Sequence, residues 1–128
     1  MIISKDLSFL LEYLEIAAPM ISQFHTLKKI TSIHGRPNTS HQIYGQMWTY
    51  KNGTRRMSLY VNYFLNDKKK YYSTIDILCT LAHELAHISY NKHSPEHKIL
   101  ECTLTTLFMS KLKTSGYQSE ELEMETIK

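Results

Sequence analysis

The chain has 128 residues, 42% of them hydrophobic, which is enough apolar material for one domain that buries its own core. Its formal net charge is +3, and charged residues such as Lys5, Asp6 and Glu12 interrupt the apolar N-terminal segment, which excludes a signal peptide or a membrane span there. Two cysteines are too few for the disulfide framework of a small secreted domain. We therefore expect Cys79 and Cys102 to be reduced, buried thiols in an intracellular protein, cytoplasmic or nuclear.

Charge is distributed unevenly along the chain. Residues 1–113 carry 14 lysines and arginines against 8 acidic residues, whereas residues 114–128 carry one lysine and four glutamates. This predicts a single domain over residues 1–113 followed by an acidic C-terminal tail over residues 114–128. Basic clusters either meet phosphates, as in a DNA partner, or are simply solvated, and the net charge does not decide between these interpretations. The clustered residues are Lys51, Arg55, Arg56, Lys68, Lys69 and Lys70.

The N-terminal segment predicts an amphipathic helix from Lys5 to about Met20. Its apolar residues recur at steps of three and four, which is the period of a helix with one buried face, and Pro19 marks its end or a bend. Residues 31–42 are rich in turn-forming residues and show no period, so they predict an irregular loop.

Two alternating runs of β-branched and aromatic residues follow, on either side of Asn52 and Gly53. An Asn-Gly pair tolerates the positive φ angles of a type I′ turn, so the sequence predicts a β-hairpin with a two-residue loop. The cross-strand pairs expected on its core face are Trp48 with Met57, Gln46 with Leu59 and Tyr44 with Val61. The strand over residues 56–63 is expected to be an unpaired edge.

Two helices are predicted after the hairpin. Ser73 and Asp76 form a capping-box pattern that begins a helix from Thr74 to about Tyr90. Ser94, followed by Pro95, begins a second helix that runs to about Lys113 and ends before Gly116. Its expected buried positions are Ile99, Leu100, Thr103, Leu107 and Leu112. These elements predict an α+β fold with an N-terminal helix, a small antiparallel sheet and two C-terminal helices.

The first of these two helices carries the pattern H-E-x-x-H, formed by His83, Glu84 and His87. Four residues of an α-helix turn through about 400°, so both imidazoles point to nearly the same side and reach one metal ion. Glu84 is rotated by about 100° from His83, which places its carboxylate beside the ion as a general base rather than as a ligand. Polar residues form one stripe on an otherwise apolar helix, which predicts a cleft there.

Two histidines hold Zn²⁺ weakly, and a catalytic zinc site uses three protein ligands and leaves one position for water. His93 is the leading candidate for the third ligand, because Asn91 tolerates the left-handed conformation that turns the chain back toward the metal. His97 is its rival, and Glu101 is a weaker candidate one turn further along. Cys79 lies one turn before His83, but a buried structural thiol explains it better than a sulfur ligand.

The segment "TLAHELAHISYNKHSPEHKIL" (residues 80–100) resembles the active-site segment of the SprT-like and WLM zinc peptidases, the group that includes Spartan-type proteases of DNA–protein crosslinks. The resemblance spans roughly residues 43–108 in its order of elements and implies a zincin-like minimal metallopeptidase fold. It also implies that His83, His87 and His93 bind zinc and that Glu84 is the base. Two positions depart from the family: Asn91 stands where WLM members often have glycine, and His97 where phenylalanine is usual.

The function expected from motif and resemblance is zinc-dependent hydrolysis of peptide bonds in protein substrates, with a water activated by Glu84. The resemblance extends this to DNA-associated or DNA-crosslinked proteins. Two alternatives remain open at the level of sequence. One is an IrrE-like regulatory peptidase that cleaves a repressor and takes its third ligand from further downstream, which makes Glu101 important. The other is a non-catalytic nucleic-acid-binding domain with a structural zinc.

Overall fold

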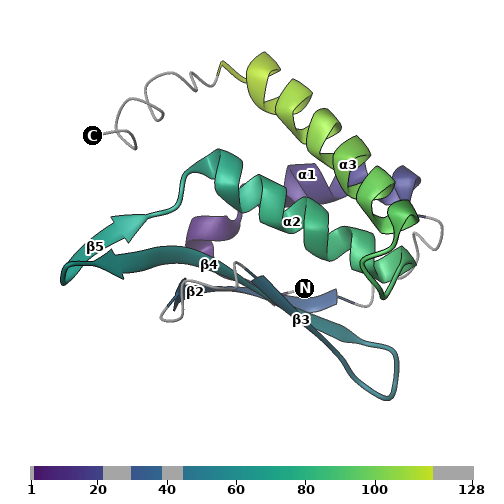
Figure 1. The fold of residues 1–128 in the computed structure, drawn as a ribbon, viewed down its shortest axis with the longest axis horizontal. Helices are drawn as coiled ribbons and strands as arrows, with labels where there is room; N and C mark the ends of the chain where they lie inside the picture. Colours follow the sequence, from purple (N-terminus) through teal and green to yellow (C-terminus); the bar gives the residue numbers. More distant parts are fainter. Residues whose placement is uncertain (1, 22–29, 39–44, 117–128) are drawn as a thin grey trace.

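The computed structural model describes residues 2–21, 30–38 and 45–116, and it places the helices over one face of a five-stranded sheet (Figure 1). This agrees with the predicted α+β class. The strands are β1 (Ile2–Ile3), β2 (Ile30–Asn38), β3 (Gly45–Thr49), β4 (Arg55–Leu65) and β5 (Lys68–Tyr71). The helices are α1 (Leu10–Ala17), α2 (Thr74–Ser89) and α3 (Pro95–Thr114), with short 3₁₀ turns η1 (Lys5–Leu7) and η2 (Ala18–Met20) beside α1.

The sheet is mixed rather than antiparallel, which corrects the prediction. Its strand order is β1-β2-β4-β3, and β5 pairs with β4. The pairs β1–β2 and β2–β4 are parallel, whereas β4 is antiparallel to β3 and to β5. The parallel pairs arise from β2, which occupies most of the predicted loop over residues 31–42. Ile30 and Ile33 of β2 are buried. The burial of these two side chains in a strand outweighs the preference of the neighbouring turn-forming residues for a loop.

The turn between β3 and β4 is one residue longer than predicted. Gly53 N–H donates to the carbonyl of Tyr50 (2.9 Å), and Gly53 has a φ of 85° while Asn52 keeps a negative φ. This is a three-residue loop with glycine in the left-handed region, not a type I′ turn. The register therefore moves by one residue, and Met47 rather than Trp48 lies opposite Met57.

The shift in register reverses the faces of β3. Trp48 and Gln46 pair with Arg56 and Ser58 on the side of the sheet away from Met57 and Leu59, so the predicted Trp48–Met57 and Gln46–Leu59 pairs are wrong. The predicted partner of Val61, Tyr44, lies outside the described residues.

A type I′ geometry does occur, at a turn that the sequence reading missed. Asn66 and Asp67 have φ angles of 51° and 62° and join β4 to β5, with Leu65 paired to Lys68. Asn and Asp are the non-glycine residues that most readily adopt positive φ, so the Asn-Asp pair was the available signal. β4 is consequently longer than expected.

The helices begin and end close to the predicted residues. At the start of α2, Ser73 Oγ accepts from the N–H of Asp76 (3.1 Å), and the Asp76 carboxylate accepts from the N–H of Ser73 (3.4 Å). Ser94 Oγ likewise accepts from the N–H of His97 (3.1 Å) at the start of α3. The N-terminal helix is shorter than predicted, because η1 and η2 replace its two ends.

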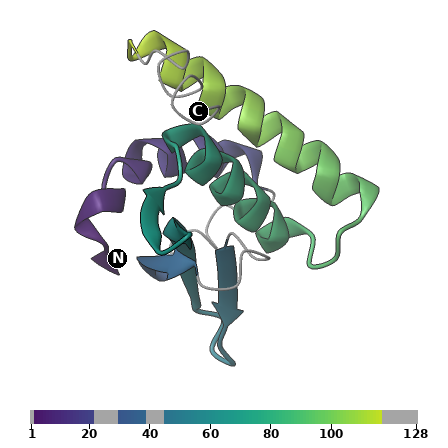
Figure 2. The same ribbon diagram turned by 60° about the vertical axis from the view of Figure 1, so that its left-hand side comes forward.

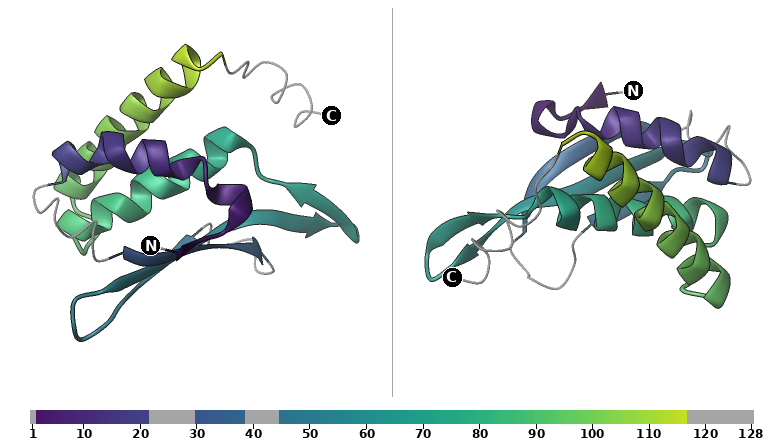
Figure 3. Two further views of the ribbon diagram at one scale, coloured as in Figure 1. Left: turned by 180° about the vertical axis from the view of Figure 1, so that it is seen from behind. Right: turned by 90° about the horizontal axis from the view of Figure 1, so that it is seen from above.

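The face of α3 that packs against the rest of the molecule agrees only in part with the predicted one, since Leu112 is buried and Leu100 is partly buried against the core. Leu104, Phe108 and Leu112 are buried, while Ile99 is 67% exposed. Through this face α3 packs on both α2 and α1, as Figures 2 and 3 show. His97 and Glu101 continue the same face toward the start of the helix, where it meets α2. The rotation of α3 thus turns both residues toward the H-E-x-x-H motif.

The two cysteines are free thiols. Cys79 is partly buried and Cys102 is exposed, so the expected burial of Cys102 is wrong because it lies off the buried face of α3. In the described ranges, no helix combines the length and hydrophobicity needed to cross a bilayer.

Candidate metal centre

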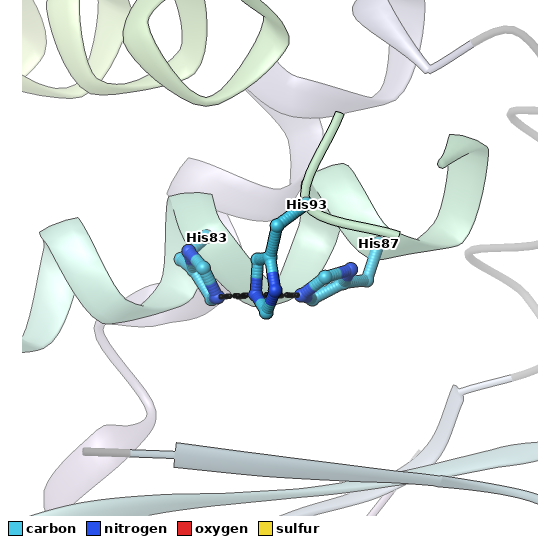
Figure 4. A group of neighbouring side chains, drawn as sticks. All are labelled: His83, His87 and His93. Atoms are coloured by element: carbon cyan, nitrogen blue, oxygen red, sulfur yellow. Dashed lines mark hydrogen bonds between the residues drawn. The ribbon is translucent and has the colours of Figure 1, made fainter. Parts of the chain in front are cut away.

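Three histidine side chains from α2 and the following turn point toward one another (Figure 4). His83 and His87 project from α2 one turn apart, and His93 reaches back from the segment that joins α2 to α3. The Nε2–Nε2 distances are 3.3 Å between His83 and His87, 3.2 Å between His87 and His93, and 3.2 Å between His83 and His93. The structure thus brings together the three residues selected from the sequence.

Hydrogen bonds at the opposite ring nitrogens fix where the protons of His83 and His87 lie. His83 Nδ1 is 2.8 Å from Glu101 Oε1, and His87 Nδ1 is 3.0 Å from the carbonyl oxygen of Tyr90. A carboxylate and a carbonyl can only accept, so both Nδ1 atoms must carry the proton and donate it. In the neutral rings, both Nε2 atoms therefore present lone pairs to each other across 3.3 Å.

Such an arrangement of lone pairs is repulsive unless a cation lies between them. Hydrogen bonds alone cannot satisfy three mutually close Nε2 atoms. Each Nε2 atom is either a donor or an acceptor, so among three of them at least two are both donors or both acceptors and cannot bond to each other. A tetrahedral zinc ion with Zn–N bonds of about 2.0–2.1 Å holds its nitrogen ligands about 3.3 Å apart. The observed spacing fits that requirement, so the donor set suits a divalent ion that prefers imidazole.

Glu84 follows His83 on α2 and is only 7% exposed. Burial raises the pKa of its carboxyl group, and Glu101 acts in the same direction, whereas His83 and His93 lower it. Among the described residues, two groups of side chains bring possible metal-ligand atoms close together, and Glu84 belongs to neither group. It does line the same cavity as the three histidines. Its carboxylate is therefore beside the candidate metal position and outside the ligand set, as the helical geometry requires.

His97, the rival third ligand, has a different position. Its side chain is 2% exposed, and its Nε2 donates to the backbone carbonyl of His83 over 3.1 Å. Burial lowers the pKa of His97, and the neighbouring His87 lowers it further, which favours the neutral ring. Its ring packs on those of His83 and His87, with centroids 4.8 and 4.1 Å away. His97 thus supports the two rings while its own Nε2 is engaged elsewhere.

Glu101 contacts the ring nitrogen of His83 that faces away from the other histidines. A second possible ligand group comprises His83, His97 and Glu101, but His83 Nδ1 carries a proton toward Glu101 and is not free to bind an ion. Lys98 Nζ lies 3.9 Å from the other oxygen of Glu101. A carboxylate in this position fixes the tautomer and orientation of a metal-binding histidine and increases its basicity.

Replacing Glu101 by leucine is expected to weaken zinc binding by about 10- to 100-fold without changing the stoichiometry, because the orientation of His83 is lost while the three ligands remain. Competition with a chromophoric chelator measures the affinity. Glu96→Leu, an exposed position in the first turn of α3, is the matched control and should bind zinc like the unaltered chain. Complete loss of zinc from Glu101→Leu would instead make Glu101 a ligand.

A cavity of about 660 Å³ lies between β3 and α2 and reaches the histidine cluster. Its lining residues are Gly45, Gln46, Met47, Trp48, Cys79, Thr80, His83, Glu84, His87, His93 and Glu101. Gly45 permits the close approach of β3 to α2, because a Cβ atom there would lie 2.7 Å from Thr80 Cγ2. Burial, then Asp76 and Glu101, raise the pKa of the Cys79 thiol, which disfavours the thiolate that a sulfur ligand requires.

The basic residues selected from the sequence do not form one patch. Lys51, Arg55 and Arg56 lie where β4 begins, and residues 68–70 lie where it ends. An 11-residue strand spans about 35 Å, so the two groups are well separated. Arg55 is also engaged within the sheet, where its guanidinium contacts Met47 Sδ (3.4 Å) and Thr49 Oγ1 (3.1 Å).

The sequence reading missed two features of the site: β3 as the strand beside the candidate metal centre, and Glu101 as the partner of His83 Nδ1. Neither follows from local pattern, although the H-E-x-x-H helix and its polar stripe did indicate a cleft. Comparison of the chain with protein-family models, with curated proteins and with solved structures finds no match. The chemistry of the site therefore has to carry the argument about function.

Proposed function

We propose that the chain is a zinc-dependent metallopeptidase that hydrolyses peptide bonds of protein substrates. The observation that carries the proposal is the triangle of Nε2 atoms from His83, His87 and His93, with the buried carboxylate of Glu84 beside it. A structural zinc site needs four protein ligands and has no use for an adjacent acid, whereas a hydrolytic site needs three ligands and a base.

Each residue has a defined part in this proposal. The three histidines would hold the ion, which would supply Lewis acidity and lower the pKa of a water molecule toward neutrality. Glu84 would take a proton from the water as its oxygen bonds to the peptide carbonyl carbon, and would pass that proton to the amine nitrogen as the C–N bond breaks. Its raised pKa suits both steps, because a base whose pKa lies closer to the working pH also donates the proton more readily.

The substrate is proposed to bind along β3. The sequence suggested an edge at residues 56–63, but this part of β4 is interior, with β2 on one side and β3 or β5 on the other. β3 ends the strand order of the described sheet, and its residues 45–48 line the cavity. An extended peptide that adds to this edge by main-chain hydrogen bonds would pass the histidine cluster.

Membership of the SprT-like or WLM group and a zincin-like fold are further parts of the proposal. Support comes from the motif and from the order of elements, in which the H-E-x-x-H helix is followed by a turn that carries the third histidine and then by the closing helix α3. The IrrE-like alternative requires Glu101 as a ligand, and its contact with His83 Nδ1 favours a positioning role instead.

Removal of zinc is expected to abolish the hydrolysis of an unfolded protein such as casein, because the three histidines alone do not activate water. Activity is measured after dialysis against dipicolinate and again after stoichiometric Zn²⁺ or Mg²⁺ is added. Zinc should restore activity and magnesium should not, since magnesium prefers oxygen ligands. Undiminished hydrolysis by protein shown to be free of metal would refute the proposal.

A further inference from the structure

The free edge of the sheet continues beyond β3. β4 pairs with β2 along residues 55–63, and it also pairs with β3 at residues 55–59 and with β5 from residue 62 onward. A strand has two sides, so β3 and β5 must both lie on the side of β4 that β2 does not occupy. Both run antiparallel to β4, and neither has a second partner strand in the described sheet. β5 and β3 therefore follow one another in line and in the same direction, and together they are here called the composite edge.

The gap within the composite edge is short. β3 begins at Gly45, opposite Leu59, and the N–H of Tyr72, which follows β5, donates to the carbonyl of Val61 (3.0 Å). Tyr60 is the residue of β4 between these two pairings. A peptide that adds to β3 as an extended strand would therefore reach β5 after one or two more residues.

The β5 end of the composite edge is positively charged. β5 consists of three consecutive lysines and Tyr71, and all four residues are exposed. In the described ranges, the ion pairs that lysines form involve Lys98 and Lys111, and none involves β5. The β4–β5 hairpin extends past the start of α2 (Figure 1), and its one acid is Asp67 in the turn. The lysines of β5 thus give this end of the edge an excess of positive charge.

Two of these lysines point to the side of the sheet that carries the candidate metal centre. Tyr72 packs against the core, and its ring centroid lies 4.8 Å from that of Tyr63, so both rings are on the helix side. Side chains alternate along a strand, which puts Lys70 and Lys68 on the side of Tyr72 and Lys69 on the opposite side. The cavity beside the histidines is on the helix side too, because it lies between β3 and α2. An extended peptide in the cavity would meet Lys70 and Lys68 with the same face.

Lysines on an edge strand have a simpler use, since they discourage pairing between copies of a sheet. That use leaves the exposed apolar neighbours unexplained, because Phe64 is 47% exposed and Leu65 is 53% exposed at the end of β4. Apolar side chains next to unpaired backbone groups favour association with another strand. The lysines then decide which strand associates: a basic strand is repelled and an acidic one is attracted.

We propose that β5 is a docking site for substrate, and that preferred substrates carry acidic side chains in an extended segment on one side of the scissile bond. The bond to be cleaved lies beside β3, and the acidic residues lie next to Lys70 and Lys68. Directly opposite side chains on adjacent strands contact each other and alternate residues share one face, so the preferred acids are two residues apart. The inference rests on the proposed peptidase function and adds the class of substrate.

The strand pairing sets the distance between these acids and the scissile bond. Met47, in the part of β3 that borders the cavity, is opposite Met57, and Lys70 is opposite Tyr63. These two positions of β4 are six residues apart, and Lys68 is two residues further along the edge. The acids are therefore expected about six and eight residues from the scissile bond, which is roughly 20–27 Å along an extended chain.

Docking is tested by fluorescence anisotropy on Glu84→Gln loaded with zinc, which is expected to bind peptides without cleaving them. The probes are labelled peptides of about 20 residues with a central Leu-Leu pair and two glutamates about six and eight residues away, on its N-terminal or its C-terminal side. A third peptide has glutamines in place of the glutamates. One glutamate peptide should bind about three- to tenfold more tightly than the glutamine peptide at low salt, and the better of the two reports the direction of the bound strand.

The lysines are tested by substitution at exposed positions of β5, where folding is not affected. Lys70→Gln should lower the affinity for the glutamate peptide about two- to threefold. Lys69→Gln makes the same change of charge on the other side of β5 and is the matched control, with unchanged affinity expected. Lys68→Glu combined with Lys70→Glu should reverse the preference, so that a peptide with lysines in place of the glutamates binds more tightly. Equal losses in Lys70→Gln and Lys69→Gln, equal affinities for the glutamate and glutamine peptides, or displacement of the peptide by equimolar oligo(dT) would each overturn the proposal.

Cleavage of the same peptides by the unaltered chain, mapped by mass spectrometry, tests the distance and separates this inference from the proposed function. The cut bond should lie about six residues from the nearer glutamate. Docking without cleavage of any peptide would keep the acidic-peptide site and rule out the peptidase. Equal cleavage of the glutamate and glutamine peptides would rule out the site and keep the peptidase.

Discussion

Glu84→Gln is expected to lose peptidase activity by about 10²- to 10⁴-fold while its zinc content stays at one ion per chain. The amide has the shape of the carboxyl group but cannot accept a proton from water, and general acid–base catalysis contributes an effect of this size. Glu84 is outside the triangle of Nε2 atoms, so its replacement leaves the ligands untouched. Hydrolysis of casein and metal analysis of the same preparation measure the two quantities.

The matched control for this experiment is Glu96→Gln, an exposed glutamate at the start of α3 that does not line the cavity. It should keep both activity and zinc. Full activity in Glu84→Gln would rule out the proposed mechanism, whereas loss of zinc from this variant would show that Glu84 belongs to the ligand set.

His93→Ala is expected to lose stoichiometric zinc, because only two imidazoles then remain and two histidines bind zinc weakly. His97→Phe should retain one zinc ion per chain, since His97 uses its Nε2 to contact the backbone of His83 rather than the ion. The variant loses one buried hydrogen bond, and we expect a decrease of about 1 kcal/mol in the free energy of unfolding. Zinc is counted by metal analysis after gel filtration.

These two substitutions discriminate between the third-ligand assignments that the sequence left open. Loss of zinc from His97→Phe with retention in His93→Ala would exchange the two roles. Retention of zinc in both, combined with its loss from Glu101→Leu, would favour the IrrE-like arrangement. Thermal unfolding of each variant in the presence of a chelator separates an effect on zinc binding from a general loss of stability.

Helices and helix ends that are determined by adjacent residues were predicted well. The capping box at Ser73, the Ser94-Pro95 start and the positive φ at Gly116 are each set by a few adjacent residues, and α2 and α3 begin and end close to the expected positions. The same holds for His83 and His87, because the pitch of a helix fixes the relative direction of residues four apart.

The sheet was predicted poorly because a strand is stabilised by partners that are distant in sequence. The β3–β4 hairpin was recognised, but its register depends on whether one or two turn residues adopt positive φ. A change of one residue moved Trp48 to the side of the sheet away from Met57 and Leu59. β2 carries turn formers and proline, and it becomes a strand through parallel pairing with β4. Its residues alone give no sign of that partner.

By itself, the sequence determined a helix that presents two imidazoles on one side with a carboxylate beside them, since the spacing of the motif and the helical repeat suffice for that. The tertiary structure alone decided that His93 rather than His97 directs its Nε2 to the other two, that Glu101 meets the far side of His83, and that β3 borders the cavity. Those outcomes depend on the direction of a turn, the rotation of α3 and the order of strands, all of which are set by packing between segments far apart in the chain.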